Sequence, residues 1–173
     1  MPYVAKQGIT VHSGDLIPGG EGVAYHDLSE TDDNTQKGAY RAYSYDGSGR
    51  VFIENTKEGE WTKHPVKIPE DGIYKIYVNA STRDISGIKA SLWLDDVQIV
   101  DKGTITNTGG YHNAVDHEMG TFSISAGSHV LKLEQTLKNF IFYSLRFVKI
   151  EDDLKPFDRN DGFDESIYNV IID

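Results

Sequence analysis

Three aromatic residues have sequence neighbours that would leave a flat ring exposed. Tyr111 lies between a Gly-Gly pair and His112-Asn113, and a large ring in such a loop has few side chains to pack against. Trp93 falls in a short segment where apolar and polar residues alternate, and Trp61 directly precedes another strand candidate, Thr62 to Ile68. An exposed ring can stack on the C–H groups of a ligand while Asn, Asp or Glu side chains bind its hydroxyl groups. The chemistry that these residues predict is binding by stacking.

Each of these rings also has a purely structural explanation. Ordinary loop packing would account for Tyr111 as well as ligand binding does. The apolar segment from Tyr168 to Ile172 could instead cover Trp61 or Trp93. The sequence leaves both explanations open.

Two groups of metal-ligating side chains fit no metal-site spacing. His112, Asp116, His117 and Glu118 do not have the spacing at which a helix or a strand holds zinc. The acidic run from Asp158 to Asp164 has its glycine one residue early for an EF-hand calcium loop. We therefore predict no metal site from either group.

Motifs for catalysis are missing from the sequence. It contains no Gly-x-Ser-x-Gly, P-loop or His-Glu-x-x-His segment, and without cysteine it has no thiol nucleophile. Glycoside hydrolysis needs a pair of carboxylates, but among 27 acidic residues some pair always exists, so their number favours nothing. We expect a protein that is not an enzyme and needs no cofactor, with a small lyase or hydrolase as the least favoured alternative.

The charge of the chain argues against two classes of partner. The formal net charge is -10 and the sequence pI is about 5.0, so nucleic acid and anionic membranes would be repelled. No stretch reaches the roughly 18 apolar residues of a membrane helix, and Met1 to Thr10 has no signal-peptide pattern. We expect a soluble piece excised from a longer protein, with no nucleic-acid or membrane partner.

The elements that must position the rings are β-strands. Apolar residues recur at period two in short runs separated by Gly, Asn, Asp and Pro. In the segment Gly72 to Ala80 this alternation turns the even-numbered residues toward a core and leaves Tyr77 in solvent. The segment that begins at Ile88 repeats the pattern, so Trp93 and Asp95 are expected to point outward.

The remaining strand candidates predict an all-β fold. They are Gly22 to Tyr25, Ala39 to Tyr43, Val51 to Glu54, Thr62 to Ile68, Thr121 to Ile124, His129 to Leu133 and Ile141 to Ile150. Turn sequences separate them, and no segment keeps a helical apolar period. We predict a jelly-roll β-sandwich of two antiparallel sheets over residues 1–153, followed by an acidic linker or docking tail at 154–173.

Several of these segments resemble, in order, those of carbohydrate-binding module family 6. The matching stretches are Gly19-Gly20-Glu21-Gly22-Val23-Ala24-Tyr25-His26-Asp27, Tyr40-Arg41, Val51-Phe52-Ile53-Glu54, Gly59-Glu60-Trp61, Val66 to Tyr74, Thr108-Gly109-Gly110-Tyr111 and Ser125 to Leu133. The resemblance covers residues 17–149 and implies a jelly roll that binds sugars. The family binds them in a cleft between loops at one end of the sandwich, or on the concave face of a sheet.

The resemblance implies a different set of residues for each of these two places. For the end cleft it implies Tyr111, with Tyr45 or Phe52 as the second ring, and Asn139 near the position of the family's asparagine. For the sheet face it implies Trp61, and there Trp93, Asp95 and Tyr77 would extend the binding surface.

The family's structural calcium takes acidic ligands from the first and last strands. The corresponding positions here hold Thr10 or His12 and Tyr143, which are not carboxylates. We predict that this calcium site is weakened or lost.

The function that the resemblance implies is that of a non-catalytic module holding a polysaccharide-degrading enzyme on a glycan. The partners would be a polysaccharide or oligosaccharide and the adjacent catalytic domain of a secreted or cell-surface protein. The alternative is a structural accessory sandwich that packs against a catalytic domain and has a degenerate sugar cleft. The short loop between Glu54 and Gly59 favours that alternative.

Overall fold

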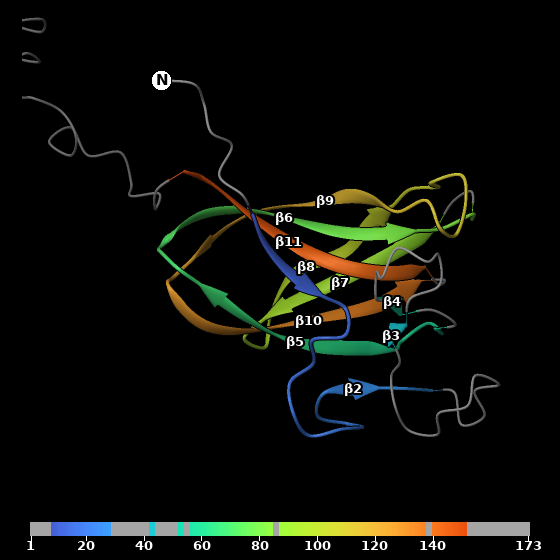
Figure 1. Cartoon of the computed structure of the whole chain (residues 1–173), viewed down its shortest axis with the longest axis horizontal. Helices are drawn as coiled ribbons and strands as arrows, with labels where there is room; N and C mark the ends of the chain where they lie inside the picture. Colours follow the sequence, from blue (N-terminus) through green and yellow to red (C-terminus); the bar gives the residue numbers. More distant parts are fainter. Residues whose placement is uncertain are drawn as a thin grey trace, which may run out of the picture.

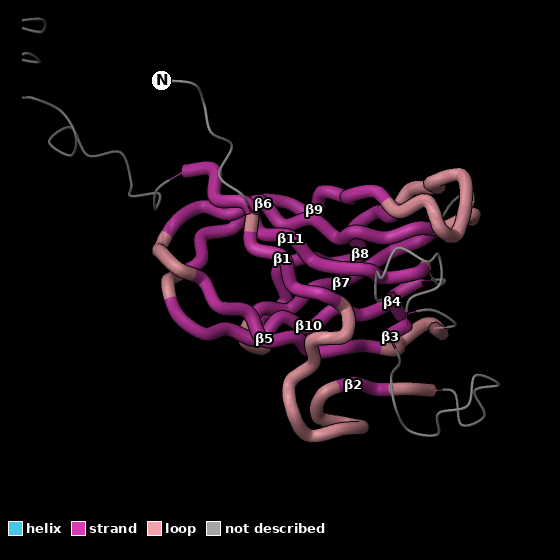
Figure 2. Tube along the Cα trace, in the orientation of Figure 1, coloured by secondary structure: helices cyan, strands magenta, loops and turns pink. Residues whose placement is uncertain are grey.

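The computed structural model describes residues 8–28, 42–43, 52–53, 56–84, 87–137 and 140–151. The regular structure in these segments is entirely β-strand, arranged as two antiparallel sheets that face each other (Figures 1 and 2). The predicted all-β sandwich is therefore confirmed. In this part of the chain no helix has the length and apolar character needed to cross a membrane.

One sheet has six strands, with β11 and β6 at its centre. Its strands are β1 (Ile9–His12), β3 (Ala42–Tyr43), β4 (Phe52–Ile53), β6 (Gly72–Ser81), β9 (Val115–Ile124) and β11 (Ile141–Glu151). They are ordered β3-β4-β11-β6-β9, and β1 also pairs with β11. Apart from β3 and β4, the neighbouring strands are distant in sequence, so only the folded chain brings their side chains together.

The other sheet has five strands, with β10 at its centre. Its strands are β2 (Tyr25–His26), β5 (Trp61–Ile68), β7 (Ile88–Leu94), β8 (Val97–Ile105) and β10 (Gly127–Leu137). They are ordered β2-β5-β10-β7-β8. From β5 onward the chain crosses repeatedly between the two sheets, and this exchange produces the jelly roll (Figure 1).

The period-two pattern correctly predicts which residues face the core. On β6, Ile76, Val78 and Ala80 are fully buried, whereas Tyr77 between them stays partly exposed. On β7 the pattern has one exception. Ser91 is directed outward yet is buried, and its hydroxyl accepts hydrogen bonds from the Lys102 N–H (3.0 Å) and the Thr136 hydroxyl (2.6 Å).

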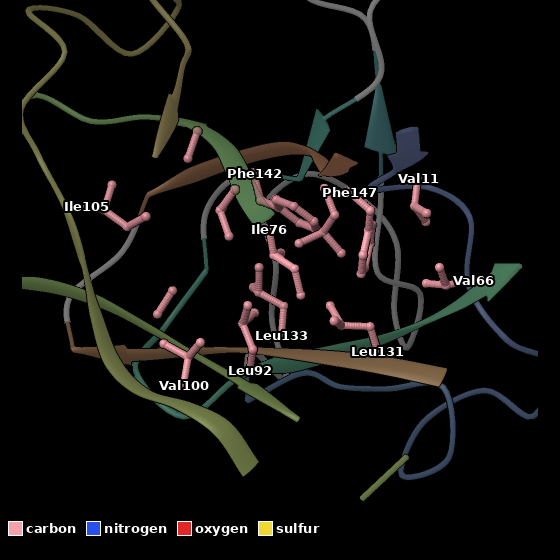
Figure 3. Close-up of a cluster of buried hydrophobic side chains, with 14 of the residues drawn as sticks. Val11, Val66, Ile76, Leu92, Val100, Ile105, Leu131, Leu133, Phe142 and Phe147 are labelled. Atoms are coloured by element: carbon pink, nitrogen blue, oxygen red, sulfur yellow. The ribbon is translucent and has the colours of Figure 1, made fainter. Parts of the chain in front are cut away.

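Side chains from both sheets interdigitate in a single main core (Figure 3). Ile76, Phe142 and Phe147 enter it from the six-stranded sheet, and Leu92 and Leu133 enter it from the five-stranded sheet. Burying one such side chain stabilises the fold by about 1.5–3 kcal/mol. This core holds the two outer faces of the sandwich rigidly.

Some strand boundaries differ from the predicted ones. β1 and β8 were not predicted, and β9 begins at Val115 rather than Thr121. β8 is an edge strand with few buried side chains, so it lacks the apolar alternation that identifies a strand. The first predicted strand is mostly a turn, and β2 is confined to Tyr25–His26. Residues 154–173, the predicted tail, lie outside the described residues.

Candidate functional site

The two tryptophans of the sequence lie on the outer face of the five-stranded sheet. Trp61 opens β5, and its neighbour Thr62 is buried toward the core, so the indole points the other way. Trp93 occupies the equivalent outward position on β7, next to buried Leu92. Both indoles are partly exposed. Strand β10 runs between them and brings them onto one surface.

A lysine from β10 fills the space between the two indoles. Lys132 pairs directly with Trp93 in the strand register, and its Nζ lies 4.4 Å from the Trp93 ring centroid and 5.0 Å from that of Trp61. Lys63 Nζ lies 5.3 Å from the Trp61 centroid. All three contacts have the geometry of cation–π interactions. We call the set Trp61, Trp93, Lys63 and Lys132 the tryptophan platform.

Polar side chains border the tryptophan platform along β10. Glu134 lies opposite Trp61 in the strand register and opposite Ser91 on its other side. The Thr136 hydroxyl lies 3.2 Å from Glu134 Oε2. These oxygens can exchange hydrogen bonds with the hydroxyl groups of a ligand that stacks on the rings.

His26 closes the β2 edge of this surface. Its ring centroid lies 6.1 Å from that of Trp61, at an interplanar angle of 37°. The His26 Nδ1–H donates to Glu21 Oε1 at 2.6 Å, and Glu21 Oε2 accepts the Asp27 N–H at 2.9 Å. The imidazole is therefore held in place beside the indole.

A buried carboxyl supports the platform from within the sheet. Glu60, next to Trp61 in sequence, is 1% exposed, and its Oε1 accepts the Leu28 N–H at 3.0 Å. Burial raises the pKa of Glu60, and the nearby Asp27 carboxyl raises it further. This contact fastens the chain that follows β2 onto the start of β5.

Asp95 was expected on the binding surface, but it lies in a tight turn. Asp95 and Asp96 have φ angles of 48° and 68° and form the two-residue connection between β7 and β8. Asp95 Oδ1 accepts the Val130 N–H at 2.8 Å, and Oδ2 accepts the His129 Nδ1–H at 2.5 Å. Because both of its oxygens already brace the turn against β10, Asp95 is better explained as structural.

The His129 imidazole is the partner of this turn. Its Nε2–H donates to the Ser125 carbonyl at 2.7 Å. Burial disfavours the charged imidazole, but the hydrogen bonds to Asp95 and Ser125 outweigh burial and raise the pKa of His129. The same pairing, together with the Val130 N–H, lowers the pKa of Asp95 against the opposing effect of its own burial.

The expectation that Tyr77 extends the tryptophan platform is wrong. Tyr77 lies on β6 in the six-stranded sheet, so it faces solvent on the opposite side of the sandwich. Its ring lies 4.7 Å from Arg146 Cζ, and the Arg146 Nη2–H donates to Asp116 at 2.8 Å. The alternation along β6 predicted an exposed ring but not the sheet to which it belongs.

Tyr111 belongs to the loop between β8 and β9, which lies at one end of the sandwich (Figure 1). The ring of the next residue, His112, lies 6.3 Å from that of Phe52 on β4. Its side chain is 39% exposed, and Arg83 Cζ lies 5.4 Å from its ring centroid. The Ser81 and Tyr143 hydroxyls donate hydrogen bonds to the Tyr111 carbonyl and fix the loop. Tyr111 is therefore exposed at this end of the sandwich, and its role in sugar binding stays a prediction.

The other residues predicted for the end cleft do not join Tyr111 there. Phe52 is fully buried, and its ring packs 5.2 Å from that of Tyr143 and 6.3 Å from that of His112. The prediction that Phe52 offers an exposed ring is therefore wrong. Tyr45 and Asn139 lie outside the described residues.

The candidate metal ligands have other partners. His117 Nδ1 accepts the Thr106 N–H at 3.3 Å, and its Nε2–H donates to the Ala80 carbonyl at 3.3 Å. Burial lowers the pKa of His117 and favours this neutral form. Thr10 and His12 pair with β11 in the strand ladder. Within the described segments, no three His, Asp or Glu side chains gather into a group that could hold a metal ion.

Comparison with known proteins gives matches among solved structures alone. No protein-family model matches the sequence, and no curated protein matches it. The C-terminal family 6 carbohydrate-binding module of LamC, a marine laminarinase from Zobellia galactanivorans, aligns with a TM-score of 0.62 at 17% identity, over 82% of this chain and 99% of that chain. The family 6 module CBM6cm-2 of Cellvibrio mixtus lichenase 5A, in complex with cellotriose, aligns with a TM-score of 0.56 at 19% identity, over 83% of this chain and 98% of that chain.

A third match lies within a longer enzyme chain. The Podospora anserina GH26-CBM35 β-(1,4)-mannanase aligns with a TM-score of 0.54 at 11% identity, over 95% of this chain and 33% of that chain. This chain has the fold of family 6 and family 35 carbohydrate-binding modules. The fold that the sequence resemblance implied is therefore confirmed.

On this carbohydrate-binding-module fold, sequence reasoning missed the two lysines that complete the platform. Within the predicted strand His129 to Leu133, buried Leu131 and Leu133 alternate with Lys132, so an outward Lys132 could have been inferred. Its position between Trp61 and Trp93 could not, because that depends on the pairing of β10 with both β5 and β7.

Proposed function

We propose that this chain is a non-catalytic carbohydrate-binding module and that its tryptophan platform is the glycan-binding surface. The observation that carries this proposal is the presence of two partly exposed indoles on one outer face of a fold shared with sugar-binding modules. One of the similar structures is a complex with cellotriose. Trp61 and Trp93 are partly exposed and Tyr111 is exposed, which favours a stacking function.

The platform combines the two contacts that sugar recognition needs. The apolar face of a saccharide can stack on an indole, and Glu134, Thr136 and the lysines can bind its hydroxyl groups. Because the surface is open, we expect weak binding, with a Kd of about 10 µM to 1 mM, or about -7 to -4 kcal/mol.

We further propose that the module serves a polysaccharide-processing enzyme outside the cell. Support comes from the matched region of the Podospora mannanase, where this fold accounts for a part of a longer enzyme chain. In that arrangement the module holds the catalytic domain on its polysaccharide and raises the local substrate concentration.

The Tyr111 loop is a second candidate place for glycan binding. Its exposed ring and the neighbouring Arg83 lie at the end of the sandwich where related modules were expected to have a loop cleft. The burial of Phe52 leaves this end without one of its two candidate partner rings. The same burial favours the structural alternative, in which the end cleft is degenerate and the sandwich packs against a catalytic domain.

Affinity electrophoresis and isothermal titration against a panel of polysaccharides test the proposal. We expect retardation on at least one glycan, lost in a Trp61→Ala variant and retained in a Tyr111→Ala variant. The reverse result would move the site to the end cleft. A folded protein that binds no glycan in the panel would refute the sugar-binding proposal and favour the structural alternative.

A further inference from the structure

We propose that the tryptophan platform is also the docking surface for an acidic segment of this chain itself, Asp161 to Asp173, and that this segment competes there with glycan. The docking needs only the charges and the rings of the platform. The competition rests on the proposed function, because it requires a glycan that stacks on the same two indoles.

The outer face around the platform is basic although the chain carries a formal net charge of -10. On β5, β7 and β10 the outward positions alternate with buried core residues. The ionisable side chains at these outward positions are Lys63, Lys67, Lys89, Lys132 and Glu134. A local basic surface on an acidic protein attracts acidic segments to that place.

The two lysines of the platform lie directly opposite each other. Lys63 on β5 pairs with Lys132 on β10 in the antiparallel register, and like charges in such pairs destabilise a sheet. Lys63 Nζ lies 3.9 Å from a carboxylate oxygen of Asp96, whose side chain is 93% exposed. Among the described residues, no carboxylate forms an ion pair with Lys132. A carboxylate between the two ammonium groups would relieve their repulsion through charge-assisted hydrogen bonds.

The two indoles set a second requirement for a partner. Trp61 and Trp93 are partly exposed, and Lys132 Nζ lies 5.0 Å and 4.4 Å from their ring centroids. A partner that covers this surface has to bring carboxylates to the lysines and apolar side chains to the rings within a few residues of each other. An acidic peptide with aromatic and branched apolar residues meets both requirements.

The segment from Asp161 to Asp173 has this composition. It contains no lysine or arginine, and Asp164 and Glu165 lie between Phe163 and Ile167. Its apolar residues are Phe163, Ile167, Tyr168, Val170, Ile171 and Ile172. The segment lies outside the described residues, so its charge and its composition are what match it to the platform.

The segment is long enough to reach the platform of its own chain. β11 ends at Glu151, which pairs with Ile73 near the start of β6, next to the turn that follows β5. Trp61 lies at the other end of β5, which has 8 residues and is therefore about 26 Å long. Facing sheets are about 10 Å apart. The chain from Glu151 to Ile167 can span up to about 53 Å, which exceeds the distance to Trp61.

The tether between the segment and the sandwich sets the size of the competition. A segment on a short linker has an effective concentration of about 1 mM at its own docking surface. With a Kd of about 0.1 mM for docking, the platform would be free about one tenth of the time. The apparent affinity for glycan would then be about tenfold lower than without the segment.

Tryptophan fluorescence tests the docking without any glycan, because both tryptophans of the sequence belong to the platform. A protease recognition site is inserted between Asp153 and Leu154, and the folded protein is cut there. We expect cutting to shift the emission to longer wavelength and to increase quenching by acrylamide. A synthetic peptide of residues 161–173, which contains no tryptophan, should reverse both changes, and 0.5 M NaCl should weaken its binding.

Variants of the full chain assign the docking to the charges. Asp164→Asn with Glu165→Gln should remove the difference between uncut and cut protein, and so should Lys132→Met. Glu70→Gln with Glu118→Gln is the matched control, because it removes the same charge from carboxylates that pair with lysines of the six-stranded sheet. This control should keep the wild-type difference, and circular dichroism verifies that each variant is folded. A wild-type difference in Lys132→Met would overturn docking at the platform.

The competition is measured with oligosaccharides of a glycan that binds in the polysaccharide panel. They should bind the cut protein, separated from the released segment, about tenfold more tightly than the uncut protein. Equal affinities for the two proteins would overturn the competition.

Failure of the docking and failure of the proposed function give different results. If cutting leaves the fluorescence unchanged and the peptide does not bind, the docking is overturned, and sugar binding is decided by its own test. If sedimentation shows a dimer that dissociates on cutting, the segment of a second copy occupies the platform, and docking within one chain is overturned. If the peptide docks but no glycan binds, the docking stands and the proposed function fails.

Discussion

The outer faces of the two sheets contain the same kinds of side chain but differ in how their charges are paired. On the six-stranded sheet Arg146 lies over Tyr77, and its guanidinium donates to Asp116 through two N–H groups, at 3.2 Å and 2.8 Å. The Asn79 amide donates to the other oxygen of Asp116 at 2.9 Å. On the five-stranded sheet the ammonium of Lys132 lies over two rings without a carboxylate partner among the described residues.

The six-stranded face has its cations paired with carboxylates of the fold, whereas the tryptophan platform does not pair Lys132 in this way within the described part of the chain. Lys75 pairs with Glu118 at 3.3 Å and Lys149 with Glu70 at 3.2 Å, so these cations of the six-stranded sheet also have partners within the fold. A cation over a ring is therefore not by itself a sign of a binding site. The platform differs because it combines two partly exposed indoles on one face with an ammonium that has no carboxylate partner among the described residues.

The largest expected effect comes from removing both rings of the platform. The double substitution Trp61→Ala with Trp93→Ala should abolish glycan binding, because aromatic anchors at an interface each contribute about 2 kcal/mol or more. Tyr77→Ala removes a ring from the opposite face and should change affinity by less than about twofold. Affinity electrophoresis compares the three proteins, with circular dichroism to verify folding. Equal losses in Tyr77→Ala and the double variant would contradict the assignment of the site to one face.

The inner side of the five-stranded sheet differs from its outer side, because there β5 buries a neutral histidine among core residues. His64 is 0% exposed, its Nδ1–H donates to the Asp15 carbonyl at 2.8 Å, and its Nε2 accepts the Thr62 hydroxyl at 2.7 Å. Burial lowers the pKa of His64 from 6.5 to about 4. In the unfolded chain the same imidazole takes up a proton at higher pH, so acid favours unfolding.

The free energy of unfolding should therefore fall as the pH drops from about 6.5 toward 4, by up to about 3 kcal/mol from this group. Above pH 6.5 the contribution is fully present, because both states are then neutral. Urea unfolding of the wild type and His64→Gln across this range measures it, and the variant should lose this part of the pH dependence. His12→Gln, at an exposed position, controls for the loss of an imidazole. Identical pH slopes in wild type and His64→Gln would show that this assignment is wrong.

The smallest effect is expected from removing a carboxylate that pairs with a cation on the outer face of the six-stranded sheet. Asp116→Asn removes the charge that pairs with Arg146, whose side chain is 37% exposed, and should lower the free energy of unfolding by about 0.5 kcal/mol. We expect the six-stranded face to gain no glycan affinity, because the described residues place no second ring beside Tyr77. Chemical denaturation and titration with the oligosaccharides measure both quantities. Acquired glycan binding would mean that an unpaired cation over one ring is sufficient.

Local residue patterns predicted much of the fold. The alternation on β6 and β7 identified which side chains enter the core, including the outward position of Trp93. It failed for β8, where the edge of a sheet exposes most side chains and the pattern disappears. It failed for Asp95 because an aspartate with a positive φ angle continues no strand and forms a turn instead.

By itself the sequence determined the fold class and the outward positions of Tyr77 and Trp93 on their strands, because the period of two is a property of a single strand. The tertiary structure alone decided which strands share a sheet. That pairing placed Lys132 between Trp61 and Trp93, sent Tyr77 to the opposite face and buried Phe52 against Tyr143. The physical reason is that strand pairing joins residues distant in sequence, and no local pattern encodes it.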